Sequence, residues 1–106
     1  MLEENVQTVS ALLKSISHPI RLRILCQLQD GEKSVGDIRS AVETTAGNIS
    51  QHLSILRNQG VVQSRRDANY IYNRISDHRV EELVNTLQAL FCEPPASERS
   101  NSEAAK

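Results

Sequence analysis

The sequence predicts one mainly helical domain that carries a single small β-hairpin. Two observations support this fold class: apolar residues recur at helical spacing over most of the chain, and the period changes to two in one short stretch. The hydrophobic fraction is 39% but the aromatic fraction is only 3%, so the core has to be built mainly from Leu, Ile and Val. With 106 residues, a single compact core is the economical assumption.

Two helices are expected before Gly31. Apolar residues at helical spacing predict an amphipathic first helix at about residues 4–16. His18-Pro19 interrupts this pattern, and Pro19 suits the first turn of a second helix that ends before Gly31. The second helix has apolar residues on more than one side, which indicates a central position. Its apolar residues are Ile20, Leu22, Ile24, Leu25 and Leu28.

Two short helices joined by a tight turn follow. Ser34 with Asp37 three residues later has the form of a capping box, and it predicts the start of a short third helix. Thr45 is the expected cap of a fourth helix, which should end near Asn58-Gln59-Gly60. One apolar stripe on this helix should be buried. It consists of Ile49, Leu53 and Leu56.

The remaining elements are a hairpin and a last helix. From Val61 onward, alternating side chains on both sides of Asp67-Ala68-Asn69 predict a two-stranded hairpin. Ser76 is expected to cap the last helix, with Asp77 in its first turn. The predicted order is thus ααααββα, a winged helix-turn-helix domain over residues 1–92. Residues 93–106 are rich in Pro, Ser, Ala and Glu, and we expect a disordered tail there.

The charge is distributed unevenly. A net charge of −1 for the whole chain argues against a nucleic-acid partner, because phosphate binding needs clustered Lys and Arg. Residues 44–74, however, carry a net charge of +3 between two acidic segments. This asymmetry fits a DNA-facing segment flanked by acidic dimerisation segments, although a charge run is more often a solvated face.

The fourth helix and the hairpin carry side chains that suit double-stranded DNA. Polar residues early in the helix match base edges in the major groove, and small residues there allow its N-terminus to approach phosphate. Arginines after this stretch suit the DNA backbone or an adjacent groove. Each residue alone also fits an ordinary solvent-facing surface, whereas their joint order favours DNA binding. The expected DNA-binding residues are Thr45, Ala46, Gly47, Asn48, Ser50, Gln51, His52, Arg57, Arg65, Arg66 and Asn69.

Five segments carry a resemblance to a known family. They are Leu22-Arg23-Ile24-Leu25, Ser34-Val35-Gly36-Asp37-Ile38, Ile49-Ser50-Gln51-His52-Leu53, Leu56-Arg57 and Gly60-Val61-Val62. With these segments the chain resembles the ArsR/SmtB family of bacterial repressors over roughly residues 6–92. The resemblance implies a homodimer formed by the first and last helices, which leaves its operator when an inducer binds.

The metal sites of that family are incomplete in this chain. Members often hold metal with a Cys-x-Cys pair at the start of the third helix, where this chain has Ser34-Val35-Gly36. Others bind Zn²⁺ through four ligands on the last helices, a set that Asp77 and His78 could begin. The matching later positions are Ala89 and Cys92, so we assign no metal site. A metal- or arsenite-responsive repressor that uses Cys26, Cys92 or His78 stays an alternative.

The two cysteines, Cys26 and Cys92, resemble those of the persulfide-sensing branch of the family. In that branch the corresponding cysteines are joined within a protomer by oxidation or by a short sulfur chain. The resemblance implies that reactive sulfur species are the inducer, with no cofactor. The alternative is that Cys26 is a buried small hydrophobe and Cys92 is incidental. Cys92 favours the sensor, because an idle accessible thiol carries a reactivity cost.

Other classes of protein find little support in the sequence. The start of the chain lacks a basic stretch before an apolar run, and no window approaches the roughly 18 apolar residues of a membrane span, so we expect a cytoplasmic protein with reduced thiols and no membrane partner. No nucleophile with its base, no paired catalytic carboxylates and no Gly-rich phosphate loop stand out, which argues against an enzyme. A winged-helix protein-interaction module without DNA binding stays open.

Overall fold

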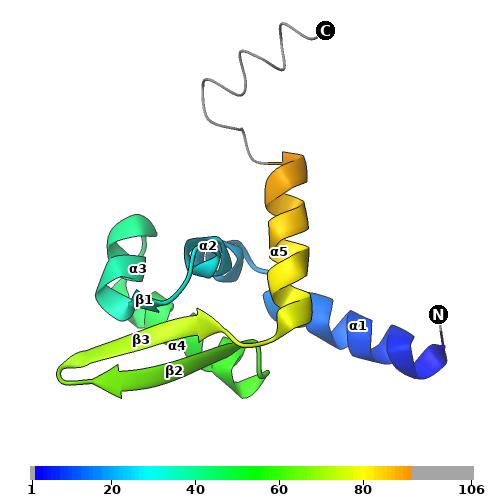
Figure 1. The fold of residues 1–106 in the computed structure, drawn as a ribbon, viewed down its shortest axis with the longest axis horizontal. Helices are drawn as coiled ribbons and strands as arrows, with labels where there is room; N and C mark the ends of the chain where they lie inside the picture. The colour runs from blue at the N-terminus through cyan, green and yellow to red at the C-terminus, as the bar shows by residue number, and fades with distance from the viewer. Residues whose placement is uncertain (1, 92–106) are drawn as a thin grey trace, which may run out of the picture.

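The computed structural model describes residues 2–91, which form five helices and three short strands (Figure 1). The helices follow one another in the predicted order, and the fold is the predicted winged helix-turn-helix. The predicted tail, residues 93–106, lies outside the described residues, as does Cys92. The elements are α1 (Glu3–Ile16), α2 (Pro19–Leu28), β1 (Lys33–Ser34), α3 (Val35–Ala41), α4 (Ala46–Asn58), β2 (Val62–Asp67), β3 (Tyr70–Ile75) and α5 (His78–Phe91).

Helices α2, α3 and α4 each begin with a side chain that accepts a hydrogen bond from a backbone N–H group of the first turn. Such a bond satisfies one of the amides that a helix leaves without an internal acceptor. The predicted caps Ser34 and Thr45 are both confirmed. The three pairs are His18 Nδ1 with Ile20 N–H (3.0 Å), Ser34 Oγ with Asp37 N–H (3.0 Å) and Thr45 Oγ1 with Asn48 N–H (3.1 Å).

The predicted cap of the last helix is wrong by one residue. The Ser76 hydroxyl turns away and donates to the carbonyl of Gly60, 3.0 Å distant. Asp77 caps α5 instead, since its Oδ1 accepts from the backbone N–H of Arg79 at 2.9 Å. A carboxylate also suits this end of a helix electrostatically.

The sheet has one strand more than predicted. β1 pairs antiparallel with β3, so that the strand order is β1-β3-β2, and Ser34 lies opposite Tyr72. The two residues of β1 are too few to show alternation in the sequence, because their pairing depends on a partner almost forty positions away. β1 leads directly into α3 and therefore attaches the hairpin, hereafter the wing (β2 and β3), to the helix-turn-helix unit.

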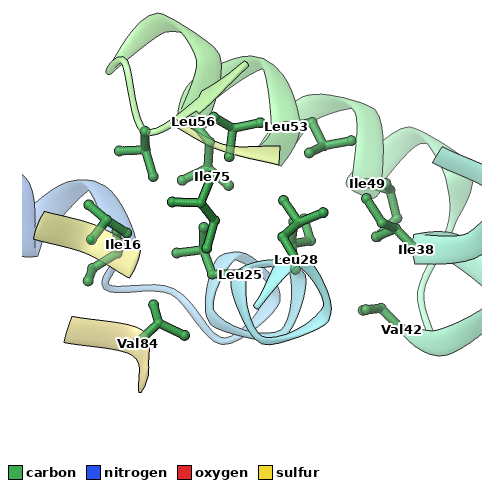
Figure 2. Close-up of a cluster of buried hydrophobic side chains, with 14 residues drawn as sticks. Ile16, Leu25, Leu28, Ile38, Val42, Ile49, Leu53, Leu56, Ile75 and Val84 are labelled. Atoms are coloured by element: carbon green, nitrogen blue, oxygen red, sulfur yellow. The ribbon is translucent and has the colours of Figure 1, made fainter. Parts of the chain in front are cut away.

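The core lies between α2 and α4. Figure 2 shows Ile49, Leu53 and Leu56 of α4 facing Leu25 and Leu28 of α2. All five side chains are at most 3% exposed, which confirms the buried stripe predicted for α4. As the composition indicated, the core residues are Ile, Leu and Val.

Helices α1 and α5 project away from this core (Figure 1). Each buries only two residues, although both carry long apolar stripes. The radius of gyration is 15.7 Å, against about 13 Å for a compact chain of about 100 residues. The stripes therefore extend beyond what this core covers. Exposed apolar residues on the two helices are Val6, Val9, Leu13, Leu90 and Phe91.

Within residues 2–91, none of the helices combines the length and the apolar character needed to cross a bilayer.

Candidate nucleic-acid interface

The first turns of α4 present most of the predicted base-reading side chains to solvent. Ile49 and Leu53 point into the core, which turns the intervening positions outward. The N-terminus of α4 also directs its first backbone N–H groups outward, as an approach to phosphate requires. The exposed members of the predicted set are Thr45, Ala46, Gly47, Asn48, Ser50 and Gln51.

Asn48 is held at the start of α4 by two threonines. Its backbone N–H donates to Thr45 Oγ1, and its Nδ2 donates to Thr44 Oγ1 at 2.9 Å. Thr44 was not among the predicted site residues. The signal that could have found it is the Thr44-Thr45 pair before a helix, because both hydroxyls lie within reach of the first turn.

His52 lies at the contact between α2 and α4 rather than on the outward face of α4. Its ring centroid is 4.3 Å from that of His18, and its Nδ1 is enclosed without a hydrogen-bond partner among the described residues. Burial, and then the neighbouring His18 and Arg21, lower the pKa of His52 below its ordinary value. Its predicted contact with DNA stays a prediction.

Arg57 connects the end of α4 to the wing. Its Nη1 lies 3.4 Å from Ser64 Oγ on β2, and Ser64 Oγ in turn donates to Oδ1 of the fully buried Asn73 at 2.6 Å. The guanidinium is exposed and therefore open to a phosphate beside the wing.

The wing carries two neighbouring arginines in different surroundings. Arg66 and Asn69 are exposed near the turn. Arg65 is also exposed, but it makes a bidentate ion pair with Glu32, with N···O distances of 2.8 and 2.7 Å. The hydrogen bond from Arg65 is the main reason that the pKa of Glu32 lies below its ordinary value.

Cys26 is exposed on α2, so the alternative of a buried Cys26 is wrong. Its helical neighbours at i−4 and i+3 both meet α5. Leu22 lines the same groove as Leu87, and Gln29 Nε2 donates to Asn85 Oδ1 at 2.7 Å. Cys26 therefore lies on the side of α2 that faces α5.

Asp77 and His78, the residues that could begin a zinc site, each interact with a different neighbour on α5. Asp77 accepts from the guanidinium of Arg79 at 2.9 and 3.1 Å, which is the main reason that the pKa of Asp77 is lowered. His78 Nε2 lies 3.2 Å from Glu82 Oε1. Between residues 2 and 91, no group of three or more His, Cys, Asp or Glu side chains is placed to hold a metal ion.

Comparison with known proteins gives consistent matches. The family model described as "Bacterial regulatory protein, arsR family" matches residues 18–64. The biofilm growth-associated repressor of Xylella fastidiosa is 37% identical over 91 residues, which are 86% of this chain and 80% of that protein. The transcriptional activator HlyU of Vibrio cholerae is 36% identical over 92 residues, which are 87% of this chain and 85% of that protein. The solved structure of reduced HlyU from the same organism matches with a TM-score of 0.83 at 36% identity, covering 86% of this chain and 96% of that one.

Proposed function

The chain belongs to the ArsR family of bacterial transcription regulators, and we propose that it is a homodimeric repressor that leaves its operator when sulfur chemistry bridges Cys26 and Cys92. Proteins of this family bind DNA and are not enzymes. The observation that carries the proposed switch is the exposure of Cys26 on the side of α2 that faces α5.

The projecting helices support a dimer. Leu90 and Phe91 are 70% and 79% exposed, and the outward residues of α1 add to the same kind of surface. Exposed apolar area costs about 25 cal/mol per Å², so a second copy that covers both helices stabilises the fold. A two-fold dimer also presents two α4 helices, which have to lie about 34 Å apart to enter successive major grooves.

In the proposed complex, the N-terminal half of α4 enters the major groove. Ser50 and Gln51 supply donors and acceptors for base edges, while Gly47 lets the helix approach the backbone closely. Arg57, Arg66 and Asn69 contact phosphates or the groove next to the wing. His52 contributes from the flank of the helix if the α2–α4 contact loosens on binding.

The proposed switch acts through α2, because α2 is packed against both α4 and α5. Its buried residues Leu25 and Leu28 face α4, and Gln29, which directly follows α2, is bound to α5. Cys92 directly follows Phe91, the last residue of α5. A bridge between the two cysteines would tie α5 to α2 and shift α4 relative to the dimer axis. A coupling of about 1–3 kcal/mol is enough to change operator affinity about 5–150-fold.

Either of two oxidants can join the thiols of Cys26 and Cys92. Glutathione disulfide takes two electrons and two protons from the thiols and leaves as two glutathione molecules, which gives a direct disulfide. Tetrasulfide dianion takes the same two electrons, places two sulfur atoms in the bridge and releases two hydrosulfide ions. A direct disulfide needs Cα atoms about 4.4–6.8 Å apart, whereas inserted sulfur spans a longer gap.

The test is intact mass together with DNA binding after treatment with sodium tetrasulfide or with glutathione disulfide. The DNA is a labelled duplex that the reduced protein selects from a random pool. We expect an intramolecular bridge and weaker binding after sulfur treatment, and neither change in Cys26→Ser or Cys92→Ser. Equal affinity of the reduced and treated proteins would contradict the switch but leave the DNA-binding role intact.

HlyU, one of the relatives, is described as an activator. A reporter gene placed behind the selected duplex therefore decides the sign of regulation. We expect lower expression when the protein is present, and higher expression would reverse the assignment of repressor.

A further inference from the structure

Arg65 and Arg66 are adjacent on β2, but the structure gives only one of them a firm partner. Among residues 2–91, the Arg66 guanidinium makes no hydrogen bond or ion pair. Arg65 uses both Nε and Nη2 on the carboxylate of Glu32. A bidentate pair of this kind fixes the plane of the guanidinium as well as its position.

The Glu32–Arg65 pair crosses the whole sheet. Glu32 directly precedes β1, Arg65 lies on β2, and β3 runs between these outer strands. On β3, Tyr72 is the register partner of Arg65, and its ring centroid lies 4.8 Å below the guanidinium carbon. These three residues, Glu32, Arg65 and Tyr72, are called the wing brace here. The brace joins the loop after α2 to the farther strand of the wing.

The opposite face of β2 is held by a different contact. Ser64 directly precedes Arg65, and successive side chains of a strand point to opposite faces. Ser64 meets Arg57 of α4 and the buried Asn73 on that face. Side chains therefore hold β2 from both faces, against α4 on one and against the loop before β1 on the other. The backbone pairing of β1 with β3 covers two positions only.

We propose that Glu32 and Arg65 are positioning residues for DNA binding, which set the angle of the wing relative to α4, and that Arg65 makes no phosphate contact. The inference rests on the proposed DNA contacts of the wing. Arg66 and Asn69 lie closer to the turn, and they are the side chains that the wing brace presents to DNA. Arg65 itself, which the sequence predicts to contact DNA, then acts only by holding the wing.

Conservative substitutions separate the two roles. A phosphate contact tolerates Arg65→Lys, because the charge is kept, and Glu32→Gln would leave binding equal or stronger. A positioning role predicts that Glu32→Gln, Arg65→Gln and Arg65→Lys weaken binding by a similar factor of up to about fivefold, the range of an exposed ion pair. The double variant Glu32→Gln/Arg65→Gln should then bind no more weakly than either single variant.

The matched control is Arg66, on the next position of the same strand. Affinity for the selected duplex is measured by fluorescence anisotropy at several salt concentrations. Arg66→Gln should reduce the slope of log affinity against log salt by about 0.9, which corresponds to one lost phosphate contact. The Glu32 and Arg65 variants should keep the wild-type slope. A lower slope for Arg65→Gln, or wild-type affinity of Arg65→Lys, would overturn the proposal.

Hydrogen exchange gives a measurement that needs no DNA. Amides of β2 and β3 should exchange faster in Glu32→Gln and in Arg65→Gln by the same factor, and at the wild-type rate in Arg66→Gln. Unchanged exchange in the first two variants would also overturn the proposal. A wild-type protein that binds no duplex would overturn the DNA function itself, and the exchange result would still report whether the brace holds the wing.

Discussion

Truncation of Leu90 should weaken self-association by an amount that follows from its exposure. Leu90 lies in the last turn of α5 and is 70% exposed in the protomer. Full burial of a Leu side chain contributes about 1.5–3 kcal/mol, so covering the exposed part contributes about 1–2 kcal/mol. A two-fold dimer contains this contact twice. Leu90→Ala should therefore raise the dimer dissociation constant at least about 30-fold, for a loss of about 2 kcal/mol.

Sedimentation velocity over a concentration series measures this constant. Ile71→Ala is the matched control, because Ile71 is a partly exposed apolar residue of the wing, where the proposed dimer has no contact. Leu90→Glu extends the test, since a carboxylate inside the interface adds a desolvation cost. If Leu90→Ala dissociates no more readily than Ile71→Ala, then the apolar stripe of α5 does not form the dimer surface.

Four further predictions concern single side chains. Gln51→Ala should weaken binding to the selected duplex by about 1–3 kcal/mol and relax its base preference at one position, and equal loss on random DNA would show a role other than base reading. Asp77→Ala should cost about 1 kcal/mol in urea unfolding and Ser76→Ala less; the reverse order would restore Ser76 as the cap of α5. Ala68→Gly should raise the free energy of unfolding by up to about 1 kcal/mol in the same assay, because Ala68 has a φ of +55°, which Gly adopts more readily than Ala. A loss of stability would show that the turn tolerates Ala. Because the folded state lowers the pKa of His52 below its ordinary value of 6.5, protonation favours unfolding, so the stability should fall as the pH drops below about 6.5. His52→Gln should flatten that dependence, and an unchanged slope would assign it to other groups.

Local rules account for most of the helical framework. The Ser34 and Thr45 caps and the stripe of Ile49, Leu53 and Leu56 depend on residues within one or two turns of each other, so their spacing alone predicts them. The same holds for the turn at Ala68, which lies between two strands of the predicted period. These features are visible in sequence because chain neighbours are also neighbours in space.

The site depends on contacts that spacing does not show. Arg65 and Arg66 are adjacent residues of the same type, so the sequence predicts the same role for both. Their surroundings differ because the strand register places Arg65 beside Glu32, which lies 33 positions earlier in the chain. The sequence alone predicts that His52 is an exposed polar residue of its helix. Its contact with His18, just before α2, becomes visible only in the fold. Cys26 belongs to a helix with apolar residues on more than one side, yet it is exposed, and only the packing of α2 in the fold shows this.

Ser34 belongs to two elements at once, as the last residue of β1 and the cap of α3. No linker therefore separates the sheet from the helix that follows it, so we expect α4 and the wing to move together as one unit. In the proposed dimer, a bridge between the cysteines would then change the distance between the two copies of this unit more easily than the structure within each copy. An inducer would accordingly change the affinity of the protein for its operator and leave its preference among half-site sequences unchanged.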